Sequence, residues 1–207
     1  MAYYHDIITQ KSWEELKILN KKVKFVLIGG WAIYLYTRQL KSKDIDILID
    51  YSELGKLKEG YDVTKNDRLK KYEARKGEIQ IDIYLPHYSE IGIPVDILIN
   101  RTISLEGFTV LKKEWLICLK IYVLSIRGRT PKGEKDFLDI LSLFKVGSGD
   151  INKIVKTIKD YNLEKQFDYF LNFLDERVEA EEIGLNKHQY KKLKTEIKDP
   201  LLTRLQN

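Results

Sequence analysis

The sequence predicts an α+β protein in which a mixed β-sheet with flanking helices precedes an all-α half. Two observations lead to this prediction. Up to about residue 110, short runs rich in Val and Ile alternate with turn signals, which is typical of strands joined by tight connections. From Lys112 onward, apolar residues recur at helical spacing instead. We therefore expect an α/β domain over 1–110 and a helical bundle domain over 111–207.

The first half is expected to begin with a helix. The segment Ser12-Trp13-Glu14-Glu15 fits the capping-box pattern, so this helix should run from Ser12 to about Lys21. A buried strand should follow at 23–28, then a helix at 31–38 and a strand at 44–50. The remaining predicted elements are a helix at 52–59 and strands at 70–75, 78–85, 95–99 and 102–110, with a hairpin turn at Lys76-Gly77.

The second half is expected to contain five helices. Their apolar stripes and flanking turn residues place them at 112–127, 134–144, 150–161, 164–177 and 186–205. The last of these is rich in lysine, with Lys191, Lys192 and Lys194 close together and Lys187 and Lys198 on either side. We interpret this run as a solvated helix face.

Composition places the chain among globular proteins. Of 207 residues, 43% are hydrophobic and 32% are charged, which excludes a disordered chain. The net charge of +5 permits a nucleotide or nucleic-acid partner without requiring one. A single cysteine, Cys118, excludes an internal disulfide. No secretory leader and no long apolar run is present, so we expect a cytoplasmic protein without membrane association. The oligomeric state is left open.

The most informative segment is an apolar strand that runs into Gly29-Gly30 and a helix, followed by a strand that carries Asp44 and Asp46. Residues two apart in a strand project from the same face, so the two carboxylates should point together. Adjacent carboxylates repel one another unless a cation lies between them. Glycines before a helix leave N–H groups accessible to phosphate oxygens. The segment therefore predicts a site for a metal-bound nucleoside triphosphate (NTP).

A third acid would complete a two-metal centre for phosphoryl transfer. Asp82 is the favoured candidate, because it lies in a strand of clean alternation with Glu78 and Gln80 on its own face. Asp96, in a shorter apolar segment, is the rival. No His or Cys accompanies the acids, so Mg²⁺ suits the site better than Zn²⁺ does. We expect two Mg²⁺ ions, held by Asp44, Asp46 and the third acid.

These residues resemble the signature of the polymerase-β-like nucleotidyltransferase superfamily: Gly29-Gly30, then Asp44-Ile45-Asp46 after thirteen residues, then Asp82. Ser42 is similar to the Ser or Thr of the abortive-infection (AbiEii-type) toxin branch. The resemblance covers about residues 23–145 and implies a nucleotidyltransferase domain. It also implies Mg²⁺-dependent transfer of a nucleoside monophosphate (NMP) from an NTP to a hydroxyl group of RNA or protein, and for this branch a place in a toxin–antitoxin pair.

The helical half extends the resemblance to that branch. Lys120 looks like its helical lysine, and Lys135-Asp136 looks like its Lys-Asp pair. The resemblance implies that Lys120 approaches the triphosphate and that Asp136 or Lys135 supports the site. Independently, Lys120 interrupts an apolar stripe, so its ammonium must reach polar partners or solvent. A second hypothesis is a catalytically inactive module that binds RNA or a partner protein through its helical half, with Arg127 and Arg129 as contacts.

Overall fold

The structure is a computed structural model that describes residues 2–147 and 149–205. The chain divides into two compact units, Met1–Lys112 and Lys113–Asn207. In the described residues, a mixed seven-stranded sheet with packed helices precedes an entirely helical region, which confirms the predicted fold class. Among the described helices, none is long and apolar enough to cross a bilayer.

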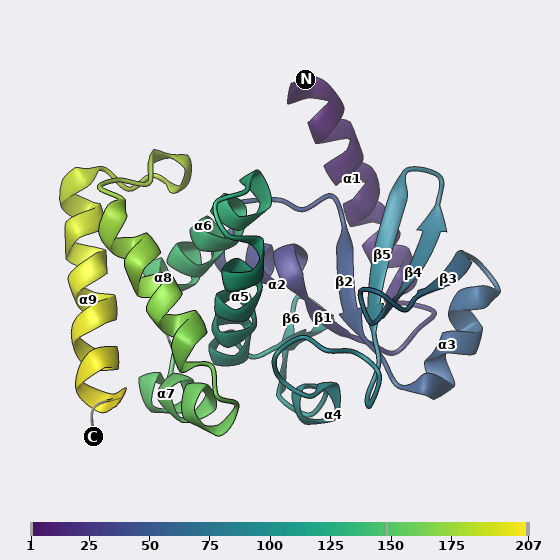
Figure 1. The fold of residues 1–207 in the computed structure, drawn as a ribbon. Helices are drawn as coiled ribbons and strands as arrows, with labels where there is room; N and C mark the ends of the chain where they lie inside the picture. The colour runs from purple at the N-terminus through teal and green to yellow at the C-terminus, as the bar shows by residue number, and fades with distance from the viewer. Residues whose placement is uncertain (1, 148, 206–207) are drawn as a thin grey trace. The chain divides into compact units, whose positions relative to one another are not determined.

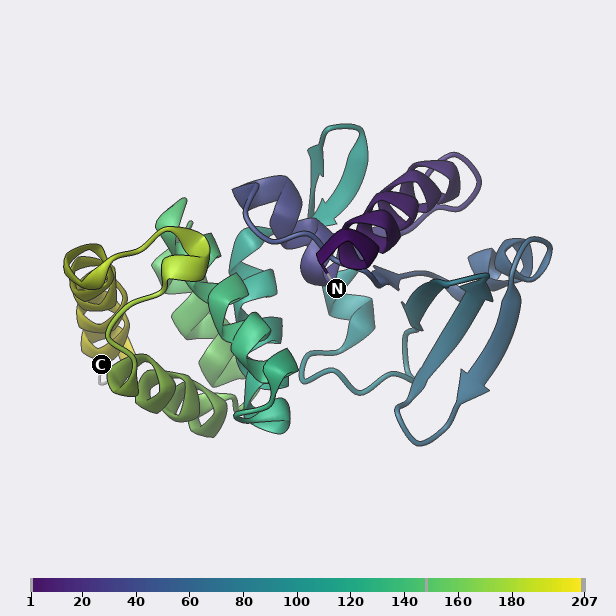
Figure 2. The same cartoon turned by 90° about the horizontal axis from the view of Figure 1, so that it is seen from above.

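The sheet of the first unit is mixed, with β2 at its centre (Figures 1 and 2). Strand β2 pairs with β1 in antiparallel and with β5 in parallel orientation. Figure 2 shows β3, β4 and β5 at one end of the sheet and the β6–β7 hairpin at the other. The strands, in sheet order, are β3 (Asp62–Asn66), β4 (Lys71–Lys76), β5 (Ile79–Tyr84), β2 (Ile45–Leu48), β1 (Val26–Ile28), β7 (Phe108–Leu111) and β6 (Thr102–Leu105).

The helices of this unit are α1 (Ala2–Leu19), α2 (Gly29–Thr37), α3 (Tyr51–Lys58) and α4 (Val95–Leu98). Helix α2 packs on β1 and β2, while α1 packs on β5. The predicted helix start at Ser12 is wrong, since Ser12 lies inside α1. Its hydroxyl is buried and accepts a 2.9 Å hydrogen bond from the indole Nε1 of Trp31 in α2. The serine that resembles a cap instead joins two helices.

Two strand predictions are corrected by the structure. The segment 95–99 is the short helix α4, because its buried residues Val95 and Leu98 are three apart and Pro94 fits at its start. The segment 102–110 is a hairpin rather than one strand. Its turn residues Glu106 and Gly107 both adopt positive φ, a conformation that matches a two-residue turn of this kind. Strand β3 was not predicted, because it is an edge strand without a buried apolar face.

The second unit is a bundle in which α5, α8 and α9 run side by side (Figure 1). Its core is aromatic: Phe137 of α6 stacks on Phe173 of α8 with ring centroids 4.4 Å apart. The helices are α5 (Lys113–Arg127), α6 (Pro131–Lys145), α7 (Ile151–Asp160), α8 (Glu164–Glu176) and α9 (Lys187–Leu205), with a 3₁₀ turn at Glu181–Ile183.

Candidate active site on the central strands

The strand register places three acidic residues in one row across the sheet. Asp46 of β2 is the partner of Asp82 in the parallel β2–β5 pair. Asp82 is in turn the partner of Glu73 in the antiparallel β4–β5 pair. Directly paired residues project from the same face of a sheet, with strands about 4.8 Å apart. We call Asp46, Asp82 and Glu73 the acidic row. The isoleucines between them point into the core, because every Ile of β2 and β5 is buried.

Gly29 lies directly against the carboxylate of Asp46. It follows Ile28, which pairs with Asp46 across the β1–β2 ladder. A Cβ atom built on Gly29 would lie 2.1 Å from Asp46 Oδ2, and the φ of Gly29 is +64°. Both the contact and the conformation therefore require glycine at this position. The turn that starts α2 and the carboxylate on β2 fit together only because this side chain is missing.

Replacing Gly29 by Ala should destabilise the protein more than the same change at Gly77. Gly77 has a similar φ of +59°, but a Cβ there would meet nothing within 4 Å. Both variants carry the left-handed strain of about 1 kcal/mol. Only Gly29→Ala must also displace the Asp46 carboxylate, so its melting temperature should fall further. Thermal unfolding of the two variants measures the difference, and equal losses would contradict the close contact.

The other residues expected beside Asp46 lie on the segments that lead to it. Asp44 comes directly before β2 and is half-buried, as Asp46 is. Ser42 is buried two residues further upstream. Gly30 is buried as the second residue of α2. Helix α2 thus begins beside the end of β2 that carries Asp46, and its first N–H groups have no intrahelical partner.

Lys71 is the buried cation of the acidic row, and the exposed Arg75 lies 3.6 Å from Glu73. The Lys71 ammonium lies 2.6 Å from Asp82 Oδ2 and 3.1 Å from Glu73 Oε1, and its side chain is only 9% exposed. The Gln80 amide donates a 2.8 Å hydrogen bond to the other oxygen of Asp82. Burial lowers the pKa of Lys71, but hydrogen bonding and attraction to Asp82 and Glu73 outweigh burial, so that its pKa is raised. Lys71 therefore stays charged and holds Asp82 in place.

The acids of the site do not form a closed metal cage. Within residues 2–147 and 149–205, no group of three or more His, Cys, Asp or Glu side chains is arranged to hold a metal ion. The carboxylates of Asp44 and Asp46 nevertheless supply the hard oxygen donors that Mg²⁺ prefers. Asp96 lies on α4 rather than on a strand, and the sheet register pairs Asp82, not Asp96, with Asp46.

In the helical unit, Lys120 is enclosed by two aspartates of α6. Its ammonium lies 2.6 Å from Asp136 and 2.8 Å from Asp139, whose side chains are 2% and 1% exposed. Burial lowers the pKa of Lys120, but the attraction of Asp139 and Asp136 and their hydrogen bonds outweigh it and raise that pKa. Lys120 thus reaches polar partners, as its place in an apolar stripe requires. Lys135 also contacts Asp139, at 3.4 Å.

The two arginines considered as nucleic-acid contacts make ion pairs within the helical unit. Arg127 lies 2.7 Å from Asp136. Arg129 pairs with Glu176, and its guanidinium lies 3.5 Å from the ring centroid of Phe173. Both side chains therefore tie α5 and the loop after it to α6 and α8.

Sequence reasoning missed Lys71, Glu73 and Asp139. A signal for the first two was present, because Lys71, Glu73 and Arg75 alternate on one face of a predicted strand, as Gln80 and Asp82 do on the next. Two adjacent strands with polar faces predict cross-strand partners. Asp139 lies three residues after Asp136, so the two share a face of their helix.

No protein-family model matches the sequence. No curated protein matches it either. Among solved structures, the chain is similar to JHP933 from Helicobacter pylori, with a TM-score of 0.53 at 15% identity over 96% of this chain and 93% of that chain.

Weaker similarities have TM-scores below that value. An antigenic nucleotidyltransferase-like protein from Paracoccidioides brasiliensis gives 0.41 at 15% identity, over 79% of this chain and 88% of that chain. ANT(2")-Ia in complex with adenylyl-2"-tobramycin gives 0.49 at 14% identity, over 76% of this chain and 94% of that chain. The similarity to JHP933 shows a shared fold.

Proposed function

We propose that this protein is a nucleotidyltransferase that moves an NMP from an NTP to a hydroxyl group of RNA or protein. One observation supports this most strongly: the Asp46 carboxylate lies between a side-chain-free turn at a helix start and a second strand acid. Helix starts bind phosphate, and paired strand acids bind the cation that accompanies it.

The donor set fits Mg²⁺, with Asp44 and Asp46 as the residues that would hold it. When bound, Mg²⁺ supplies positive charge to the triphosphate and to the acceptor oxygen. Gly29 keeps the backbone open, so that phosphate oxygens are able to approach the first N–H groups of α2. Lys71 fixes the orientation of Asp82 and offsets the repulsion among the acids.

Lys71 bears on the number of metal ions. Its ammonium already neutralises Asp82, so a second divalent ion there must displace it or share the carboxylate. We propose one Mg²⁺ at Asp44 and Asp46, with Lys71 as the second cation. The two-ion centre expected from the sequence is the alternative.

Replacing Lys71 by Met should therefore raise the number of bound divalent ions from one to two, because Asp82 loses its cation while Glu73 keeps only the more distant Arg75, at 3.6 Å. Titration with Mn²⁺, followed by electron paramagnetic resonance in the presence of a non-hydrolysable NTP analogue, counts the ions. Lys65→Met, a control on the exposed strand β3, should leave one. Two ions in the unsubstituted protein would show that a divalent ion displaces Lys71 from Asp82 or shares that carboxylate with it.

The function itself is tested by label transfer. The purified protein is incubated with Mg²⁺, each of four NTPs labelled at the α-phosphate, and RNA and protein fractions. We expect label to be joined to one fraction, and the joining to be lost in Asp44→Asn. No transfer with any NTP or fraction would favour the alternative, an inactive nucleotidyltransferase-like binding module. The ion pair between Lys71 and Asp82 is in keeping with this alternative, because it occupies a carboxylate that a metal ion would otherwise use. Membership of the abortive-infection branch, which the resemblance of Ser42, Lys120 and Asp136 implies, stays a prediction, and so does a toxin role.

A further inference from the structure

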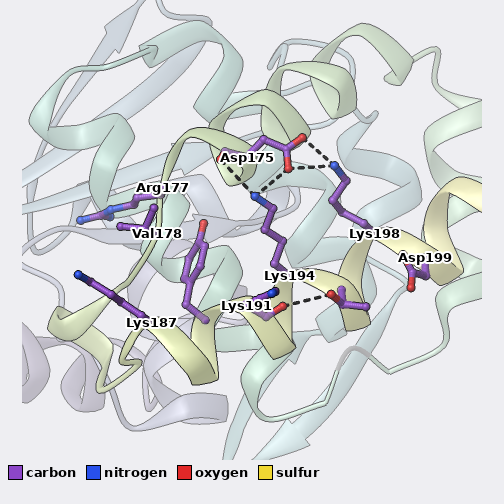
Figure 3. A pocket seen from close by; sticks show the side chains of 10 residues that line it. Asp175, Arg177, Val178, Lys187, Lys191, Lys194, Lys198 and Asp199 are labelled. Carbon is purple, nitrogen blue, oxygen red and sulfur yellow. Dashed lines mark hydrogen bonds and ion pairs between the residues drawn. The ribbon is translucent and has the colours of Figure 1, made fainter.

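A groove on the helical unit is lined by more cations than anions. It lies between α9 and the end of α8 with the loop after it, and its volume is about 580 Å³ (Figure 3). The lysine row, by which we mean Lys187, Lys191, Lys194 and Lys198, follows one face of α9. These residues are separated by four, three and four positions, the spacing that aligns side chains on a helix.

Two members of the lysine row are held in place. Lys194 and Lys198 both reach the carboxylate of Asp175, at 2.9 and 2.7 Å, and are about one quarter exposed (Figure 3). The hydrogen bond from Lys198 and then that from Lys194 lower the pKa of Asp175. One carboxylate thus offsets only one of two ammonium groups. Each ammonium has three donors, so both keep donors for a further anion.

The other two members are exposed. Within the described part of the chain, neither Lys187 nor Lys191 makes an ion pair or hydrogen bond through its ammonium group. Arg177 also lines the groove but is paired with Glu182 and Glu134. Asp199 is the one other acidic residue of the lining. In formal charge, Asp175 and Asp199 balance Lys194 and Lys198, so the net positive charge of the lining lies with Lys187 and Lys191.

The length of the lysine row decides which anion fits. Its ends are eleven residues apart, which is about 16 Å along a helix. A single phosphate group is satisfied by one or two of these ammonium groups, whereas a chain of phosphates engages all four. At the rim, Val178 is 61% exposed and offers apolar surface beside the charges. A positively charged groove that follows the phosphate backbone is typical of proteins that bind single-stranded nucleic acids.

We propose that this groove binds the phosphate backbone of a single-stranded nucleic acid, with the lysine row as its contacts. The run that sequence patterning assigns to a solvated face is then a binding surface. The proposal stands independently of nucleotidyl transfer, because it uses no residue of the acidic row and no feature of α2.

The test measures binding of a fluorescently labelled single-stranded RNA to the full chain by anisotropy at several salt concentrations. Lys187→Ala/Lys191→Ala should weaken binding about tenfold. A plot of the logarithm of the association constant against the logarithm of the salt concentration should become shallower by about 1.4, because two phosphate contacts are lost at ~0.7 each. The matched control is Lys165→Ala/Lys192→Ala, which removes the same charge from exposed positions outside the groove. It should change affinity less than twofold.

Three outcomes would overturn the proposal. Equal losses in both double variants would mean that net charge alone attracts RNA. Unlabelled RNA displaces the labelled RNA at a certain total concentration of phosphate groups. If ATP or inorganic phosphate displaces it at the same concentration of phosphate groups, the groove is a small-anion pocket. Binding to phosphatidylserine vesicles that depends on Lys187 and Lys191, without binding to RNA, would indicate a membrane surface. Retained RNA binding in Asp44→Asn/Asp46→Asn would support the proposal even if nucleotidyl transfer is never observed.

Discussion

Replacing Asp46 by Asn should lower the rate of nucleotidyl transfer by roughly 10²- to 10³-fold, the loss that follows removal of one principal electrostatic group from an active site. Asn keeps the shape of Asp but not its charge, so the site loses a ligand for the cation. The β2 backbone and the buried Ile45 and Ile47 beside it are unchanged, so the fold should persist. Initial rates with a labelled NTP, together with thermal unfolding, measure both quantities.

Asp62→Asn is the matched control for that experiment. It makes the same chemical change on an exposed position of the same sheet, at the edge strand β3. Its rate should stay within twofold of the unsubstituted protein. An Asp46→Asn variant that keeps more than half the activity would exclude Asp46 as a cation ligand. The proposed site on β2 would then be wrong.

Replacing Lys120 by Met should destabilise the helical unit by about 3–5 kcal/mol, the usual result of removing one partner from a buried ion pair. Asp136 and Asp139 would lose a shared cation at 2.6 and 2.8 Å while remaining buried. Asp136 would keep Arg127 at 2.7 Å, whereas Asp139 would keep Lys135 at 3.4 Å. The Oδ1 atom of Asp139 lacks a hydrogen-bond partner within the described residues, so the buried charge of Asp139 would be poorly compensated. Hydrogen exchange of the α5 and α6 amides reports the loss directly.

Lys135→Met separates burial from charge in this cluster. Lys135 contacts the same Asp139, but at 3.4 Å and with 39% of its side chain exposed. Removing this exposed partner should cost less than about 0.5 kcal/mol. Similar losses in the two variants would show that the enclosure of Lys120 is energetically unimportant.

The stabilisation that Lys120 contributes through Asp136 and Asp139 should persist at alkaline pH. The folded-state pKa of Lys120 is raised above its ordinary value of 10.5, so its stabilising contribution is complete below that pH. It is lost only as the pH rises through the higher folded-state pKa. The difference in stability between the unsubstituted protein and Lys120→Met should therefore be constant from pH 7 to 10 and shrink above that range.

Much of the architecture was predictable because periodicity is a local property. The alternation in β2 and β5 and the apolar stripes of the later helices arise from residues a few positions apart. The errors fall where distant partners decide. Ser12 has the sequence setting of a cap, yet its hydroxyl bonds Trp31. Val95–Leu98 is too short for periodicity to separate strand from helix.

The same reasoning explains what could be predicted of the site. The candidates Gly29, Asp44, Asp46 and Asp82 could be proposed because their order in the sequence is itself informative, and the strand register brings Asp82 beside Asp46. The ion pair between Lys71 and Asp82 was not identifiable, since the register of two strands determines which polar residues meet across them. A sequence indicates which strand face is polar, but the pairing selects the partner.

The β4–β5 hairpin has a consequence for how the protein folds. Its two strands are joined by a short turn at Gly77, so the contact between Lys71 and Asp82 closes a loop of ten intervening residues. The β2–β5 pairing instead joins segments more than thirty residues apart, and closing longer loops carries a larger entropy loss. We therefore expect the hairpin to form before the β2–β5 pairing. In that order, Asp46 would pair beside an Asp82 carboxylate whose charge Lys71 already compensates. The ion pair would thereby reduce the repulsion between Asp46 and Asp82 as β2 joins β5.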